Sequence, residues 1–173
     1  MNQGEIKPGD PGAWRRPLTR IGVISDTHMR SPSRELCALV EEGGVFADAD
    51  MILHAGDIVQ LNVLDALAPK EVVAVCGNMD FGDVPRQLPQ KRVVEVEGKR
   101  IGLIHGWGFG GDLEKRILPE FEDVDSIVYG HTHRPANRVL GGVLMFNPGS
   151  FGSGRTVGIL EVGDSIRGGI IEL

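Results

Sequence analysis

The feature of this sequence that most constrains its fold is a set of short apolar runs that each lead into polar residues. Five such runs occur, at residues 21–25, 51–54, 72–76, 100–104 and 126–129. Short runs of this kind are typical of strands that are buried on both faces of a parallel sheet. The polar residues that follow them are Asp26, His28, Asp57, Asn78, His105, His131 and His133. Because ligands bind beyond the carboxyl ends of strands in α/β sheets, these side chains are predicted to share one site.

Helical and further strand signals complete the pattern. Ser31 and Pro32 predict the start of a helix that stops at Gly43 and Gly44, and Pro69 ends a second helix. That second helix covers 61–68. The remaining predicted elements are a hairpin of 93–96 and 100–104 with its turn at 97–99, a short helix capped by Asp112, and strands at 143–146, 156–162 and 166–171. Parallel βαβ units followed by hairpins predict a mixed α/β domain with two packed sheets and helices outside.

One domain is predicted over residues 20–173. Residues 1–19 are rich in glycine, proline and charged residues and show no hydrophobic periodicity, so they are predicted to form a flexible N-terminal tail.

Composition and charge narrow the classes of partner. The net charge is −6, from 24 acidic and 18 basic residues, which argues against nucleic acid as the main partner. No apolar run reaches the roughly 18 residues of a membrane span, and no secretory signal is visible. Cys37 and Cys76 form no metal-binding or disulfide pattern and are expected to be reduced thiols. We therefore expect a cytoplasmic protein without a membrane partner; the sequence leaves a homo-oligomer open.

The types of the seven clustered side chains indicate divalent metal ions. Carboxylate, imidazole and amide oxygen without thiolate suit Mn²⁺, Ni²⁺, Fe²⁺ or Zn²⁺, with Mn²⁺ expected first. Residues i and i+2 of an extended segment face the same way about 6.5–7 Å apart, and paired metals lie about 3.5–4 Å apart. His131 and His133 can therefore reach different ions, and Asp57 can bridge them. Two ions per chain would outweigh the charge of Asp26 and Asp57, so the pocket would attract phosphate.

These blocks resemble the calcineurin-like metallophosphoesterase superfamily, in particular its small single-domain YfcE-type branch. The motifs that match in order are D-x-H (Asp26, His28), G-D (Asp57), G-N-x-D (Asn78, Asp80), H-G (His105) and G-H-T-H (His131, His133). The later block at 147–150 also resembles that branch. The resemblance implies a four-layer α/β/β/α sandwich of two mixed sheets with a dinuclear site at the strand ends.

The resemblance also implies roles for the residues. One metal would take Asp26, His28, Asp57 and His133, and the other would take Asp57, Asn78, His105 and His131. Asp57, Asn78 and His105 would then be the catalytic residues, and a metal-bridging hydroxide would attack phosphorus in line with the leaving group. Many relatives carry a histidine after Gly-Asn that protonates the leaving oxygen. Here that position is Met79, which cannot transfer a proton.

Several neighbours of the motifs have two interpretations. His54 and Asp80 are expected to support the ligands rather than bind metal. Arg30, Arg34 and Arg134 flank the ligand loops and either grip phosphate or are solvated. Asn147 and Ser150 either line the pocket or form a turn. The glycine-rich stretch at 106–111 follows no P-loop pattern and is predicted to be a flexible wall that offers an aromatic face to substrate.

Three functions compete for a chain with these features. The favoured one is a phosphoesterase, more specifically a phosphodiesterase, that hydrolyses a small phosphate ester. The alternative is a protein-binding scaffold similar to the small retromer subunit, which should lose ligands and expose an apolar patch. A nuclease is disfavoured by the short length and the acidic charge.

Overall fold

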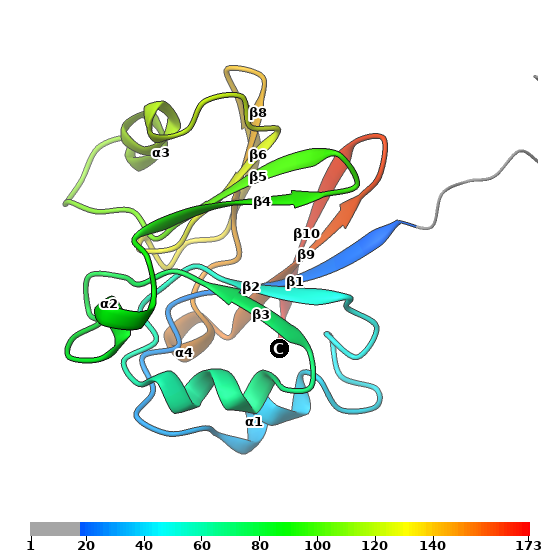
Figure 1. Ribbon diagram of the computed structural model, residues 1–173, viewed down its shortest axis with the longest axis vertical. Coiled ribbons are helices and arrows are strands. Elements are labelled where there is room, and N and C mark those ends of the chain that lie inside the picture. Colours follow the sequence, from blue (N-terminus) through cyan, green and yellow to red (C-terminus); the bar gives the residue numbers. More distant parts are fainter. Residues whose placement is uncertain (1–17) are drawn as a thin grey trace, which may run out of the picture.

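The structure, a computed structural model, describes residues 18–173 and contains two five-stranded sheets (Figure 1). The first sheet has the order β10-β9-β1-β2-β3 and consists of β1 (Thr19–Ile24), β2 (Met51–His54), β3 (Glu71–Ala74), β9 (Thr156–Val162) and β10 (Ile166–Glu172). The second has the order β4-β5-β6-β8-β7 and consists of β4 (Lys91–Val96), β5 (Lys99–Ile104), β6 (Ser126–Val128), β7 (Ala136–Leu140) and β8 (Val143–Asn147). Both sheets are mixed, with three parallel strands each and antiparallel strands beside them.

Short helical segments lie around the two sheets. They are α1 (Arg34–Ala38), η1 (Leu61–Leu67, a 3₁₀ helix), α2 (Val84–Gln87), α3 (Leu113–Ile117), η2 (Leu118–Glu120, 3₁₀) and α4 (Phe151–Gly154). In Figure 1 the first sheet lies between α1 and the second sheet, and α3 lies on the far side of the second sheet. The predicted α/β/β/α sandwich of two mixed sheets is confirmed. Within residues 18–173 no helix has the length and apolar character that a bilayer crossing requires.

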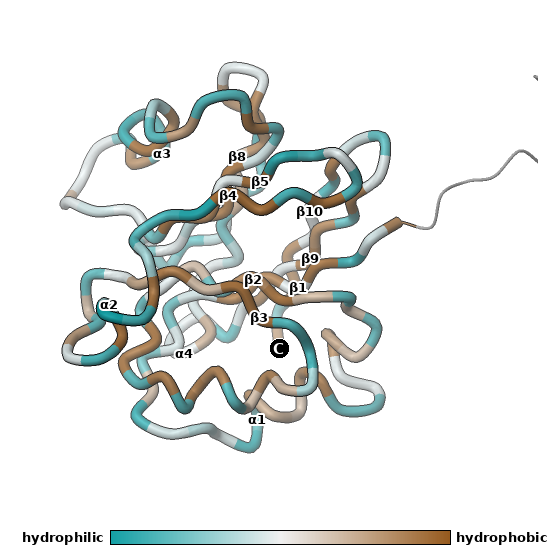
Figure 2. Tube along the Cα trace, in the orientation of Figure 1, coloured by the Kyte–Doolittle hydropathy of each residue, from teal (hydrophilic) through white to brown (hydrophobic). Residues whose placement is uncertain are grey.

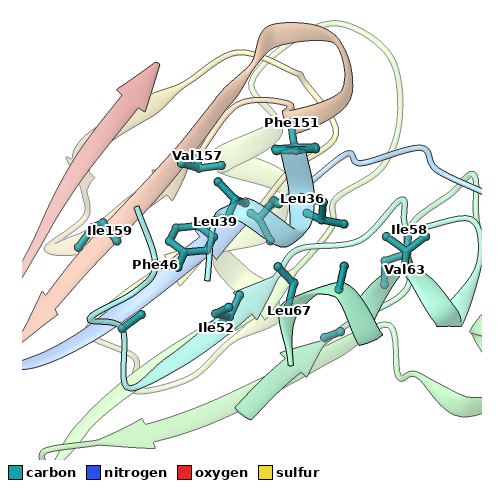
Figure 3. Close-up of a cluster of buried hydrophobic side chains, with 14 residues drawn as sticks. Leu36, Leu39, Phe46, Ile52, Ile58, Val63, Leu67, Phe151, Val157 and Ile159 are labelled. Carbon is teal, nitrogen blue, oxygen red and sulfur yellow. The ribbon is translucent and has the colours of Figure 1, made fainter. Parts of the chain in front are cut away.

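Three apolar clusters hold the layers together. The cluster between the sheets takes side chains from both, including Val23 and Leu53 from the first and Leu103 and Phe146 from the second. A second cluster joins the first sheet to α1 and η1, and Figure 3 shows Leu36, Leu39, Phe46, Ile52 and Leu67 in it. The third packs α3 on the second sheet. In Figure 2 the hydrophobic colour follows β1, β2 and β3, whose apolar runs made them predictable from sequence.

The helix predicted from Ser31 and Pro32 is wrong in its bounds. Ser33 is the N-cap residue, because its hydroxyl accepts the backbone N–H of Leu36 at 3.1 Å, and the helix starts at Arg34. It ends long before Gly43, since the N–H of Phe46 binds the carbonyl of Leu39 at 2.7 Å and turns the chain back into the core.

Other local expectations also needed correction. The predicted helix at 61–68 is a 3₁₀ helix that ends where Ala68 adopts the extended conformation favoured before proline. Asp112 precedes α3 as expected, but its side chain caps nothing and pairs with Lys115 at 2.6 Å. Most of the predicted tail lies outside the described residues, and Thr19 already belongs to β1.

Candidate metal centre

The seven predicted ligands lie at one edge of the two sheets, each in the loop that follows a strand. Asp26 and His28 follow β1, Asp57 follows β2, Asn78 follows β3, His105 follows β5, and His131 and His133 follow β6. All five are strands of the parallel parts of the sheets, whose carboxyl ends meet at this edge. The structure therefore brings all seven side chains together.

The backbone at this edge is strained. Asp26, His28, Asp57, His131 and His133 have φ between 50° and 70°, in the left-handed region that non-glycine residues rarely adopt. Such strain costs about 1–3 kcal/mol per residue and persists where the surroundings fix it, typically at functional sites.

Two glycines allow the ligand loops to approach each other. A Cβ on Gly77 would collide with the carboxylate and backbone nitrogen of Asp57. A Cβ on Gly130 would press on the Asp26 carboxylate. Glycine at these two positions is therefore required by the close packing of the loops.

The first group of donor atoms centres on Asp26. Its Oδ1 lies 3.2 Å from His133 Nε2 and 3.8 Å from His28 Nε2, and these two nitrogens are 3.2 Å apart. The three atoms converge on one point and could hold one cation.

The second group centres on Asn78. Its Oδ1 lies 3.0 Å from His105 Nε2 and 2.8 Å from His131 Nδ1. Asp57 stands between the groups, with Oδ2 at 3.3 Å from His105 Nε2 and 3.7 Å from His28 Nε2. A bridging carboxylate needs a position of this kind.

Hydrogen bonds from the opposite ring nitrogens orient two of the histidines. His105 Nδ1 donates to the carbonyl of Ala55 at 2.7 Å, and His131 Nε2 donates to the carbonyl of Gly108 at 2.7 Å. A ring oriented in this way presents its other nitrogen, Nε2 of His105 or Nδ1 of His131, to the proposed metal position.

The carboxylates differ in their electrostatic surroundings. Burial raises the pKa of Asp26 above its usual value, although His105 and His133 act in the opposite direction. Burial also acts to raise the pKa of Asp57, but the hydrogen bond and charge of His105 outweigh it and hold that pKa below the usual value. Burial lowers the pKa of His105, and Asp57 more than compensates, so that this pKa is raised.

Asp26 provides the test of whether these residues fit a metal. Its Oδ1 is completely buried and accepts no hydrogen bond within residues 18–173. Buried polar atoms are nearly always paired, and an unpaired carboxylate oxygen is especially unfavourable. Imidazole nitrogens of His28, His105 and His133 lie 3.2–4.0 Å from it. A cation among these atoms would satisfy the oxygen, so the residues fit divalent metal.

His54 and Asp80 support the ligand loops. His54 is fully buried, and its Nδ1 accepts the N–H of Gly56 while its Nε2 lies 3.2 Å from the hydroxyl of Thr27. Burial, together with the charge of His105, lowers the pKa of His54 to about 3, so the ring is neutral. The two oxygens of Asp80 accept the N–H groups of Val59 and Gly77, at 2.6 and 2.7 Å.

Asn147 and Ser150 are buried and hold the loops from the other side. Asn147 Nδ2 donates to the carbonyl of Gly130 at 2.8 Å and to the hydroxyl of Thr132 at 3.1 Å. The hydroxyl of Ser150 donates to the carbonyl of Asp26 at 3.0 Å. These contacts place both residues behind the site rather than on a substrate surface.

The remaining candidates point away from the centre or into solvent. Arg34 pairs with Glu41 at 3.0 Å, and Arg134 lines a separate cavity of about 440 Å³. Arg30 is exposed and makes no hydrogen bond or ion pair with residues 18–173. The side chain of Met79 is 47% exposed, while its N–H donates to Asp57 Oδ1 at 2.7 Å.

Sequence reasoning missed several supporting residues. Ser153 lies 3.3 Å from His133 Nδ1, and Thr27 lies beside His54. A cavity of about 310 Å³ opens next to Asn78 and His105 and includes Lys91 and Glu120 in its wall. No motif surrounds Lys91 or Glu120, so only the fold reveals that they are near the centre.

Comparison with known families and proteins agrees with this geometry. The chain matches the calcineurin-like phosphoesterase superfamily domain over residues 19–165. It is 40% identical over 137 residues to the "Probable metallophosphoesterase" of Methanothermobacter thermautotrophicus, covering 75% of this chain and 76% of that protein. It is 38% identical over 156 residues to the phosphodiesterase YfcE of Escherichia coli, covering 77% and 79%.

A solved structure shows the same fold. Vacuolar protein sorting 29 of Cryptosporidium parvum superposes with a TM-score of 0.71, at 23% identity, over 91% of this chain and 93% of that one. At this identity the likeness concerns the fold alone.

Proposed function

The chain belongs to the calcineurin-like phosphoesterase superfamily, and on this premise we propose that it is a metal-dependent phosphodiesterase acting on a small phosphate ester. The observation that carries the proposal is the convergence of three imidazole nitrogens on the buried, unpaired Oδ1 of Asp26. Burying a carboxylate oxygen that accepts no hydrogen bond is unfavourable, and a cation bound among these nitrogens would offset that cost.

The proposed ligands form two overlapping sets. Asp26, His28, Asp57 and His133 would hold one ion, and Asp57, Asn78, His105 and His131 would hold the other. Their short distances support this division, with Asp57 between the sets. Oxygen and imidazole donors without thiolate favour Mn²⁺, with Ni²⁺, Fe²⁺ and Zn²⁺ as alternatives.

Two ions bound there would activate water and neutralise the charge on the phosphoryl oxygens during in-line displacement. The residues of the chain have distinct tasks around them. Asp57 supplies negative charge to both positions, and Asn78 supplies a neutral oxygen to one. His105 orients its Nε2 through the bond from Nδ1 to Ala55 and holds Asp57 in place.

Among the described residues that flank the ligand loops, the three candidates Met79, Asp80 and His54 offer no proton donor for the leaving oxygen. Asp80 uses both oxygens as acceptors of backbone N–H groups, and His54 is neutral and fully buried. Met79 extends towards solvent and has no proton to give. We therefore infer that the enzyme favours esters whose leaving group departs as a stable anion.

Turnover of simple esters tests the function. The protein, freed of metal by a chelator and then given Mn²⁺, Ni²⁺ or Zn²⁺, is assayed against 4-nitrophenyl phosphate, bis(4-nitrophenyl) phosphate and cyclic nucleotides. We expect Mn²⁺-dependent hydrolysis with the diester preferred. An absence of hydrolysis of every ester with every metal would refute the proposal.

A protein-binding scaffold is the second candidate, favoured by four exposed apolar residues that lie near the proposed ligands in the sequence. These are Met79, Phe81, Trp107 and Phe109. A scaffold has no need of the full donor set, which this chain retains. Substitution of His131 should abolish turnover if the chain is an enzyme, whereas a scaffold would show no turnover to lose.

A further inference from the structure

A cavity adjoins the candidate metal centre on one side. It has a volume of about 310 Å³ and includes Asn78 and His105 in its wall, so it opens directly onto two proposed ligands. Cavities from about 300 Å³ upwards are the usual size of small-molecule sites. A phosphoryl group at the centre would have one of its ester arms within reach of this space.

Trp107 is the one aromatic residue among those that line the cavity, and the backbone of its loop is held from two directions. Its carbonyl accepts Arg116 Nη2 at 3.1 Å, and Arg116 Nη1 also donates to the carbonyl of Gly110 at 3.0 Å. Between these points, the carbonyl of Gly108 accepts the ring Nε2–H of His131. The loop that carries Trp107 is thus bonded both to α3 and to a proposed ligand, while the Trp107 residue stays 43% exposed.

The charges in the cavity wall cancel. Lys91 Nζ lies 2.8 Å from Glu120 Oε2 and also donates to the carbonyl of Glu120 at 3.0 Å. Lys91 and Glu120 together have no net charge, so this pair does not attract a second phosphate or a carboxylate. The amide of Gln90, also in the wall, supplies a neutral donor and acceptor.

From this combination we propose that the cavity binds one uncharged, planar arm of a phosphodiester, an aryl or nucleoside group, which stacks on Trp107. The inference rests on the proposed function and adds the class of substrate. Trp107 would then be a determinant of specificity, and monoesters with small alkyl groups would leave the cavity empty.

Calorimetric binding of two phosphonates to the Mn²⁺-loaded protein tests the proposal. Methylphosphonate and phenylphosphonate carry the same charged group and differ only in the arm. We expect phenylphosphonate to bind about tenfold more tightly, as base–aromatic stacking typically contributes. Trp107→Ala should remove this preference without weakening methylphosphonate binding, and Trp107→Phe should keep most of it.

Two further variants sharpen the test. Phe109→Ala is the matched control, since it removes a fully exposed ring from the same loop outside the cavity and should leave the preference intact. Glu120→Gln removes the carboxylate that pairs with Lys91. The affinity for 4-carboxyphenylphosphonate should therefore rise about two- to fivefold relative to that for phenylphosphonate.

The outcomes separate this inference from the function on which it rests. Equal binding of the two simple phosphonates, or a preference that survives Trp107→Ala, overturns the subsite while the phosphodiesterase proposal stands. Failure of both phosphonates to bind overturns the phosphate-binding centre and the subsite with it.

Discussion

Replacement of Asp26 by asparagine should have opposite effects on stability with and without metal. In the metal-free protein, Asp26 Oδ1 is a buried carboxylate oxygen without a hydrogen-bond donor in residues 18–173. The amide side chain would remove the charge, keep an acceptor for the N–H of His131, and offer an N–H donor to a facing imidazole. Relief of an unsatisfied buried group is worth about 1–3 kcal/mol.

The melting temperature converts this energy into a measurable shift. For a chain of this size, about 2 kcal/mol corresponds to a rise of about 4–8 °C. With Mn²⁺ at about 100 times its dissociation constant, the original protein gains about 2.7 kcal/mol for each occupied site, and the variant loses much of that gain. In calorimetry, the melting temperature of Asp26→Asn should therefore be higher than that of the original protein without metal and lower with metal.

Asp80→Asn is the matched control for this experiment. Asp80 is also buried, but both of its oxygens accept backbone N–H groups, so the same chemical change leaves one of those N–H groups unpaired. We expect Asp80→Asn to lower the melting temperature of the metal-free protein. Two results would refute this explanation of the buried oxygen. One is a metal-free Asp26→Asn variant with a lower melting temperature than the original protein. The other is an equal rise in melting temperature of Asp26→Asn and the original protein when Mn²⁺ is added.

Three other perturbations have defined outcomes. Asp57→Asn should reduce bound Mn²⁺ and turnover more than Asn78→Ala, because the proposed bridge at Asp57 would supply charge to both ions; equal losses in metal analysis and kinetics would contradict this proposed role. Asn147→Ala removes the bond that steadies Thr132, and dialysis should show an Mn²⁺ affinity about 10–100-fold weaker; an unchanged affinity would mean that the loop is held by other contacts. Turnover should fall steeply as the leaving-group pKa rises, and Met79→His should selectively help alkyl leaving groups, by up to about 10²-fold if the imidazole acts as an acid; a shallow dependence in the original enzyme would show that another acid is present.

Most of the fold and the clustering of the site were predictable from the sequence because both follow from local patterns. Apolar runs that end in Asp26, Asp57 or His105 mark strands and place their last residues at one edge. The resemblance of the motifs to a known family then predicted the order of the layers, which the apolar runs alone left open.

The missed features depend on contacts that the local pattern does not encode. β7 is an edge strand that is mostly exposed and carries Asn137 and Arg138, so it lacks the apolar signal of its neighbours. Ser33 rather than Ser31 caps α1 because its hydroxyl accepts the N–H of Leu36, and the turn at Phe46 follows the early end of this helix. Lys91 and Glu120 are 29 residues apart in the sequence, so only the tertiary fold brings them together. The cytoplasmic location, the absence of nucleic acid partners and the metal assignments stay predictions.

A titration of hydrolysis against bound Mn²⁺ decides whether the centre is dinuclear and catalytic. Metal-free protein receives Mn²⁺ in steps, and the bound ions per chain and the rate on bis(4-nitrophenyl) phosphate are measured in the same samples. We predict that the rate reaches its plateau at about two ions per chain and returns to zero with chelator. A rate that is independent of bound Mn²⁺, or a plateau at one ion per chain, would contradict the dinuclear centre.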